Sequence, residues 1–351
     1  MSKGLRKKKS MITIENLSNY KNNIFTWFSN VALKLFLGLS ISDRIDLNDV
    51  KELYGKLSLF LEEEKDRLKK YNIDVCSDIP LPVSRNDPIE KINLCEATNI
   101  LKRLCSGEEL DSVPLISALS IEFAEYTRAF TGRGRLKRDL YVLREDVLAL
   151  SVIGAYLSRS YKVGNEYGYI FLDMTYPNVK DINRLNTNAR ILARRIIGEG
   201  KGPVTTLIVG IASLLASNKE ILENIIQAPV TLSMIRMSKT QYKVLLNAYE
   251  TIEIGDLANT LYKLGIGSSV YHILSRYPSE NEVKAIKENA RYKRFSDLLS
   301  ISILKYYWLT DRTYLYDILR SLYIEEVSKA LKVRLGDKTD NVKNNLLSMR
   351  F

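Results

Sequence analysis

The residues best suited to bind a polyanion lie between positions 128 and 144, where six basic side chains stand against one acid, Asp139. The basic residues are Arg128, Arg133, Arg135, Lys137, Arg138 and Arg144. Gly132 and Gly134 interrupt the segment, so we expect its first half to form a loop. Arginines on such a loop can approach a phosphate backbone closely, each with two parallel donors. The segment predicts contact with nucleic acid; the alternative is a solvated basic loop.

A second basic group lies where a helix expected over 188–197 runs into a glycine-rich loop over 198–202. It comprises Arg190, Arg194, Arg195 and Lys201. Another helix is expected to begin at Pro203, with free backbone N–H groups and a favourable dipole at its start. This pattern can provide a contact with backbone phosphates, but it predicts a glycine cap followed by a mobile loop more strongly. It is neither a phosphate-binding GK[ST] motif nor a GxGxxG fingerprint.

A third basic group mixes cations with aromatic rings over 283–295. Its cations are Lys284, Lys287, Arg291, Lys293 and Arg294. Tyr292 and Phe295 lie among them and could stack on unpaired bases while the cations neutralise phosphates. The alternative is that the rings belong to the core and the cations to a solvated face.

The remaining reactive side chains do not form a catalytic set. The chain has one histidine, His272, which argues against zinc hydrolases and Ser–His–Asp triads. Cys76, Cys95 and Cys105 are too scattered for a zinc motif, and we expect three reduced, mostly packed thiols. Asp173 follows an expected strand, but nothing after it completes a nuclease constellation. We therefore expect no catalytic residue, metal or cofactor, and no enzyme activity.

The elements expected to position these groups are mostly helices. Apolar spacing predicts helices over 47–68, 89–104, 114–129 and 145–161. The helix over 114–129 would have Pro114 at its first position and Ser112 as its cap. The C-terminal third, 240–335, is expected to be almost all helix. Strands are expected over 167–174, over 230–237 as its partner, and over 11–14. The sequence thus predicts a predominantly α-helical α+β fold with a small β element in the middle and a C-terminal helical bundle. Expected domains are 1–77, a basic tail and helical region; 78–237, mixed α/β with the basic loop; and 238–351, helical.

Overall charge and hydropathy limit the partners and the compartment. The 351-residue chain carries a formal net charge of +11 at pH 7, which favours a polyanionic partner. It has no run of about 20 apolar residues and no secretory signal, so we expect a cytoplasmic protein without a membrane span.

Residues 254–277 resemble the helix-turn-helix of winged-helix regulators of the multiple-antibiotic-resistance type. Helices 256–264 and 268–275 would flank a turn at 265–267. The resemblance implies that Ser268, Ser269, His272, Ser275 and Arg276 face DNA. No wing hairpin is expected to follow, because 280–289 has a helical pattern. A DNA-binding transcription regulator is therefore the alternative function.

The chain as a whole resembles the large subunit of an archaeal subtype I-A CRISPR interference (Cascade) complex. The resemblance lies in YGYIFLDMTYP at 167–177, ARILARRIIGEGKGP at 189–203 and the tyrosine-rich helical end. It implies a non-catalytic subunit in antiviral defence that helps recognise the protospacer-adjacent motif and stabilises the opened target DNA. Guide RNA, target DNA and other effector subunits would be its partners. The resemblance transfers no individual site residue to this sequence.

Overall fold

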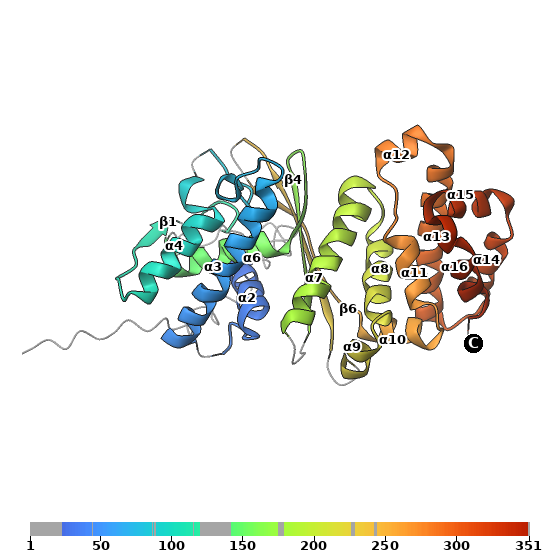
Figure 1. Ribbon diagram of the computed structural model, residues 1–351, viewed down its shortest axis with the longest axis horizontal. Helices are drawn as coiled ribbons and strands as arrows, with labels where there is room; N and C mark the ends of the chain where they lie inside the picture. Colours follow the sequence, from blue (N-terminus) through green and yellow to red (C-terminus); the bar gives the residue numbers. More distant parts are fainter. Residues whose placement is uncertain are drawn as a thin grey trace, which may run out of the picture. The chain divides into compact units, whose positions relative to one another are not determined.

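The chain folds into a predominantly helical α+β structure with a small antiparallel sheet, which confirms the expected fold class. The computed structural model describes residues 23–43, 45–85, 87, 89–114, 116–119, 142–174, 179–225, 229–241 and 244–349 (Figure 1). Contacts divide the chain into two compact units. Unit 1 comprises 1–159, 165–167 and 236–248, and unit 2 comprises 160–164, 168–235 and 249–351.

Among the described residues, the helices of unit 1 are α2 (Ile24–Leu37), α3 (Leu47–Lys69), α4 (Leu94–Cys105) and α6 (Glu145–Ser158). Helix α6 packs against α2 and α4, and α3 packs against α4 (Figure 1). The crossing of α2 and α6 is close because Gly154 has no side chain: a Cβ there would lie 1.8 Å from the Phe28 carbonyl oxygen. Ser29 and Ser151 join their hydroxyls across the same crossing at 3.2 Å.

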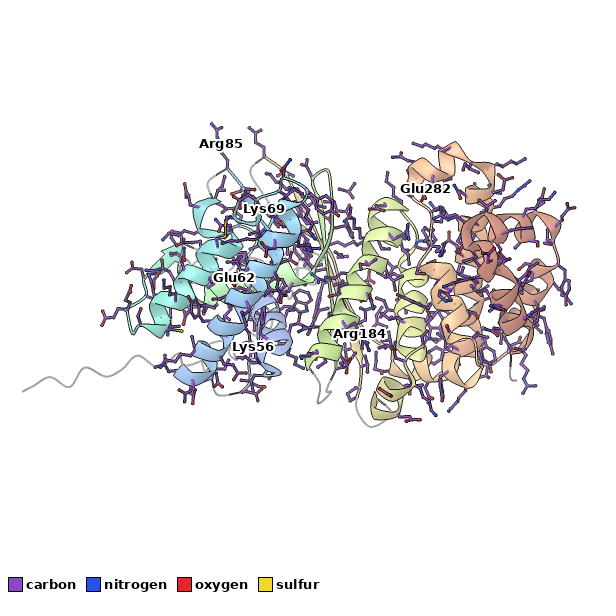
Figure 2. The ribbon with its side chains drawn as sticks, in the orientation of Figure 1. Lys56, Glu62, Lys69, Arg85, Arg184 and Glu282 are labelled. Carbon is purple, nitrogen blue, oxygen red and sulfur yellow. A yellow bond between two sulfur atoms is a disulfide. The ribbon has the colours of Figure 1, made fainter. Side chains whose placement is uncertain are left out.

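Helix α3 shows how the spacing of apolar residues determines where a helix forms and which face it buries. Asp46 begins it with a capping box, in which its side chain accepts from the Asp49 N–H and the Asp49 carboxylate accepts from the Asp46 N–H. The helix buries Val50, Leu53, Leu57 and Leu61 on one face. Glu62, Glu63 and Asp66 are exposed (Figure 2 labels Glu62), whereas Glu64 is only 13% exposed and accepts from the Tyr156 hydroxyl at 2.8 Å.

Three expected boundaries in unit 1 differ from the structure. A short 3₁₀ turn η2 (Ile89–Lys91) precedes α4, which starts only after the cap residue Asn93. The expected helix from Pro114 is wrong at its start: strand β1 (Ser112–Pro114) pairs antiparallel with β2 (Val142–Arg144). Pro114 fixes a backbone φ that suits a strand edge as well as a first helical turn, so its presence did not decide between them. Helix α6 ends at Ser158, where β3 (Arg159–Val163) begins.

The expectation of three reduced thiols is wrong for two of them. Cys76 and Cys95 form a disulfide with their Cα atoms 5.3 Å apart. It joins the 3₁₀ turn η1 (Val75–Ser77) to the first turn of α4. The pairing arises from the tertiary fold, which brings together residues 19 apart in sequence. Cys105 keeps a free, half-buried thiol, and burial raises its pKa.

The larger sheet has the order β3-β4-β5-β6, with β4 at Glu166–Asp173, β5 at Thr231–Lys239 and β6 at Val244–Glu253. The neighbouring positions of β4 and β5 confirm that the two strongest strand patterns pair. Strand β6 corrects the expectation of helix from Thr240. Its backbone pairs with β5, and this pairing overrides the weak local preference of the segment.

Unit 2 is a helical bundle around α8 (Val204–Ala216), which packs against α7, α10, α11 and α13. The flanking elements are α7 (Val179–Ala193), the π-helix η4 (Arg194–Glu199), α9 (Lys219–Ile225), α10 (Gly255–Lys263), α11 (Gly267–Leu274), α12 (Glu280–Ala285), α13 (Lys287–Leu309), α14 (Thr313–Leu322), α15 (Glu325–Leu335), η5 (Gly336–Lys338) and α16 (Thr339–Leu347). The expected C-terminal helical bundle is confirmed. Among the residues described, no helix has both the length and the apolar character needed to cross a membrane.

Candidate cationic groove

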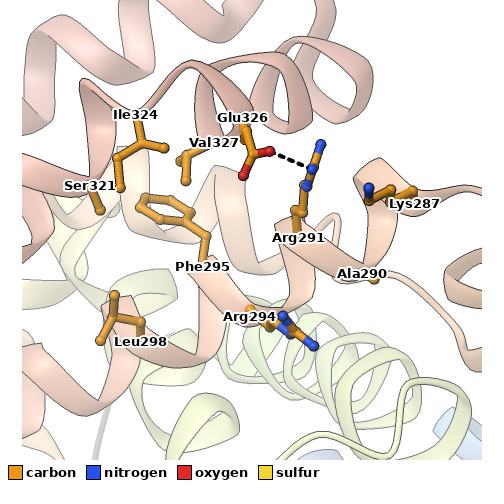
Figure 3. Close-up of a pocket in the computed structure, with 10 residues that line it drawn as sticks. All are labelled: Lys287, Ala290, Arg291, Arg294, Phe295, Leu298, Ser321, Ile324, Glu326 and Val327. Carbon is orange, nitrogen blue, oxygen red and sulfur yellow. Dashed lines mark hydrogen bonds and ion pairs between the residues drawn. The ribbon is translucent and has the colours of Figure 1, made fainter.

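A groove of about 490 Å³ lies in unit 2 between α13 and the segment where α14 passes into α15 (Figure 3). Helix α13 contributes most of the lining, and the facing wall comes from the end of α14 and the start of α15. The lining residues are Lys287, Ala290, Arg291, Arg294, Phe295, Leu298, Ser321, Ile324, Glu326 and Val327. We call it the cationic groove.

The cations of the groove share one face of α13. Lys287, Arg291 and Arg294 are separated by four and then three residues, the spacing that places helical side chains above one another. Helix α13 begins at Lys287, directly after the cap residue Ile286, so all three lie in its first two turns. The sequence predicted each of them as a contact to nucleic acid, and the structure brings them together.

The three cations differ in how they are held. Arg291 is fixed because its Nη2 lies 2.6 Å from Oε1 of Glu326, an ion pair that crosses the groove (Figure 3). Lys287 and Arg294 are exposed and have no carboxylate partner in the described part of the chain. Lys284, near the end of α12, is also exposed and has no such partner there. The groove therefore offers two uncompensated positive charges, those of Lys287 and Arg294, and Lys284 adds a third that does not line the groove.

The walls between these cations are apolar. The Phe295 ring is almost completely buried and borders the groove, together with Leu298, Ile324 and Val327. The polar lining residues other than the cations are engaged: Ser321 donates to the Ile318 carbonyl and Glu326 holds Arg291. The arrangement can bind an anionic group beside an apolar body, and it has no paired acid and base for chemistry.

Lys293 was expected to contact nucleic acid but is a structural residue. It lies outside the helix face shared by Lys287 and Arg294, and its Nζ donates to the Gly200 carbonyl at 2.6 Å. The same ammonium lies 5.9 Å from the centre of the Tyr277 ring. Because 293 is one residue before 294, it faces another side of the helix. The sequence could not show which cation of the cluster turns inward.

The glycine-rich loop is a packing feature, which corrects the expectation of a mobile loop. A Cβ at Gly200 would lie 2.7 Å from the Tyr277 ring, and one at Gly202 would lie 2.6 Å from the Tyr277 hydroxyl. That hydroxyl donates to Asp297, which also accepts from Thr206 of α8 at 2.9 Å. Burial, followed by the charge of Asp297, raises the pKa of Tyr277, so the phenol stays protonated.

The second basic group does not line the groove. Arg195 donates from Nη1 to the Ser275 carbonyl at 2.7 Å, and Arg194 pairs with Glu199 at 2.8 Å. Arg190 donates to the Thr187 hydroxyl, and Lys201 lies 3.6 Å from Glu280. Arg194 and Lys201 lie beside carboxylates and Arg195 is held by a backbone carbonyl, so these cations are less available to an external anion than Lys287 and Arg294. No signal in the sequence distinguishes these two classes.

Of the first basic group, the structure describes Arg144, which ends β2 and pairs with Asp146 at 2.7 Å. The group's predicted contact residues Arg128, Arg133, Arg135, Lys137 and Arg138 lie outside the described residues. The prediction that they contact nucleic acid stays a prediction.

The backbone of the expected helix-turn-helix is present, but one of the residues expected to face DNA is buried. Helices α10 and α11 flank a turn in which Gly265 has a φ of 74°. Ser269 is buried, so the expectation that it faces DNA is wrong, and α11 packs against both α8 and α16. Burial and the charges of Lys338 and Arg276 lower the pKa of His272. These contacts give α11 the role of a bundle helix.

The described ranges contain no cluster of three or more side chains able to hold a metal ion. Comparison with known proteins found no matching family model, no matching curated protein and no matching solved structure. The case for function therefore depends on the geometry and charge of the chain itself.

Proposed function

We propose that this chain is a non-catalytic nucleic-acid-binding protein and that the cationic groove is one of its phosphate-binding surfaces. The observation that carries the proposal is the exposed pair Lys287 and Arg294, which share a helix face and have no carboxylate partner in the described residues. Charges of both signs are usually interspersed on protein surfaces, as in the ion pairs Arg291–Glu326 and Lys201–Glu280 of this unit. An uncompensated row of cations attracts a polyanion and gains from releasing its counterions.

The shape of the groove favours a nucleotide unit over a bare anion. A nucleotide has a phosphate and an apolar sugar and base, and the groove sets Lys287 and Arg294 beside Phe295, Leu298 and Ile324. Arg294 can offer two parallel donors to one phosphate, and Lys287 can act as a point charge on the next. Phosphate contacts of this kind position a strand without reading its sequence.

More specifically, we propose that the chain is a subunit of a CRISPR effector complex. In that complex it would help recognise the protospacer-adjacent motif and stabilise the opened target DNA. Guide RNA, target DNA and other effector subunits would be the partners. The support for this form is the resemblance of 167–177 and 189–203 to the Cascade large subunit, together with the net charge of +11. Co-purification of the tagged chain with a guide RNA would support it, and its isolation without RNA from a cell that expresses the complex would count against it.

A charge-matched pair of variants tests the groove itself. The groove variant carries Lys284→Ala, Lys287→Ala and Arg294→Ala. The control variant carries Lys263→Ala, Lys332→Ala and Lys338→Ala, three exposed cations of the same unit that do not line the groove. Each variant loses three positive charges. We expect the groove variant to lose about tenfold or more in affinity for fluorescein-labelled DNA, and the control to change much less. Equal losses would show that only net charge matters.

A further inference from the structure

The outer face of α13 continues beyond the groove as one exposed stripe along the whole helix. Its positions alternate in steps of four and three residues, the heptad spacing of a helix that packs against another helix. The stripe consists of Lys287, Arg291, Arg294, Leu298, Ile301, Lys305 and Trp308. At 1.5 Å per residue it is about 32 Å long. It contains no acidic residue.

The stripe changes its chemistry at Leu298. Before that position it is cationic and forms the groove. After it, Leu298, Ile301 and Trp308 are 43%, 40% and 67% exposed. Isolated exposed apolar residues are common, but three that recur on one helix face mark an interaction surface. A straight, exposed face of this length can be covered by a partner helix that lies along it.

Charge identifies the kind of helix. Lys305 lies between Ile301 and Trp308, with its Nζ 5.2 Å from the centre of the Tyr314 ring and no carboxylate partner in the described part of the chain. A second copy of this chain would bring cation against cation, since the stripe has no acid. Segments 1–22 and 120–141 of the chain have more basic than acidic residues, so they are also poor partners. An amphipathic helix with acidic residues could cover the apolar side chains and pair with Lys305.

We propose that the C-terminal half of the stripe, Leu298 to Trp308, binds an acidic amphipathic α-helix of a partner protein. Apolar side chains of the partner cover Ile301 and Trp308, and a carboxylate pairs with Lys305. The site adjoins the cationic groove at Leu298, which lines the groove, but the proposal does not depend on the nucleic-acid proposal.

The test uses the full chain and a fluorescein-labelled synthetic helix of about three heptads, with leucine at positions a and d and glutamate at e and g. We expect saturable binding by fluorescence anisotropy. Ile301→Glu should weaken it by about tenfold or more, because it places a charge in the apolar centre of the interface. Leu59→Glu in α3, another exposed apolar position, is the matched control and should bind as wild type. Circular dichroism confirms that both variants are folded.

A charge exchange tests the pose. The Lys305→Glu variant should no longer bind the helix with glutamate at positions e and g. It should instead bind a version with lysine at those positions, because the charge at position 305 is reversed. Failure of the glutamate helix to bind, equal binding to Ile301→Glu, or no exchange of preference at Lys305→Glu would each overturn the proposal. So would a dimer in sedimentation that Ile301→Glu dissociates.

Nucleic acid at this surface is the remaining outcome. If Trp308→Ala weakens DNA binding as much as the groove variant does, bases stack on Trp308 and the helix proposal falls while the proposed function stands. If Trp308→Ala weakens the peptide and leaves DNA binding unchanged, the helix proposal is supported. Loss of all DNA binding in the wild type would overturn only the proposed function.

Discussion

At the scale of single residues, Gly200 shows that a glycine can be fixed by its neighbours and not by its own backbone angles. Its φ is −92°, which any residue can adopt, yet a Cβ would lie 2.7 Å from the Tyr277 ring and 2.9 Å from the Arg195 carbonyl oxygen. Gly200→Ala must therefore displace Tyr277 and strain its bond to Asp297. We expect a loss of about 1–3 kcal/mol in the free energy of unfolding, measured by urea denaturation.

Gly55 is the matched control for that variant. It lies in the exposed middle of α3, and nothing lies within 4 Å of the position of a Cβ. Gly55→Ala should stabilise the chain by about 0.5–1 kcal/mol through helix propensity. Equal effects of the two substitutions would show that Tyr277 does not pack tightly against the loop.

Glu282 gives a residue-scale prediction for pH. The hydrogen bond that Glu282 accepts from Arg334, followed by the one from the Ser279 N–H, lowers its pKa from the ordinary value of 4.5 to about 2 (Figure 2 labels Glu282). Because the folded pKa lies below the unfolded one, the stabilisation is present above about pH 4.5 and is lost as pH falls towards 2. Glu282→Gln should therefore lower the melting temperature at pH 7, and the difference from wild type should shrink below pH 4.5. A difference independent of pH would contradict this.

At the scale of elements, local pattern predicted those helices and strands whose apolar signal is strong: α3 is buried along one face and β4 along nearly its whole length. Helix α3 follows its 3.6-residue apolar spacing, and β4 follows its aromatic and β-branched residues. Strands β1 and β6 were missed because their conformation comes from pairing with β2 and β5, which no local signal records. In the site, Arg291 and Arg294 were predicted, but Glu326, 35 residues from Arg291, became part of it only through folding.

The disulfide is an element-scale feature that sequence reasoning missed, and it makes a stability prediction. Cys76 and Cys95 close a short loop that ties η1 to α4, and removing such a cross-link costs about 3 kcal/mol in the chain-entropy model. Cys76→Ser should lower the melting temperature of the oxidised protein and abolish its sensitivity to dithiothreitol. Cys105→Ser should retain that sensitivity. A wild type that melts identically with and without dithiothreitol would show that the cross-link does not form or does not stabilise.

At the scale of the whole molecule, the cations behind the net charge of +11 differ in whether they bind other groups of the protein or face solvent. Lys293 and Arg195 hold backbone carbonyls inside unit 2, and Arg291 is neutralised by Glu326. Within the described part of the chain, Lys287 and Arg294 are exposed cations that have no carboxylate partner. Composition could predict a polyanionic partner, but only the fold separates the cations that build the protein from those that face outward.

The measurement that tests the central proposal most directly is the salt dependence of DNA binding by the wild type and the groove variant. Each phosphate contact on duplex DNA contributes about −0.9 to the slope of log affinity against log salt. The loss of Lys284, Lys287 and Arg294 should therefore make the slope shallower by about 2–3, while the control variant keeps a slope close to that of the wild type. Identical slopes for the wild type and the groove variant would contradict the assignment of the groove to nucleic acid.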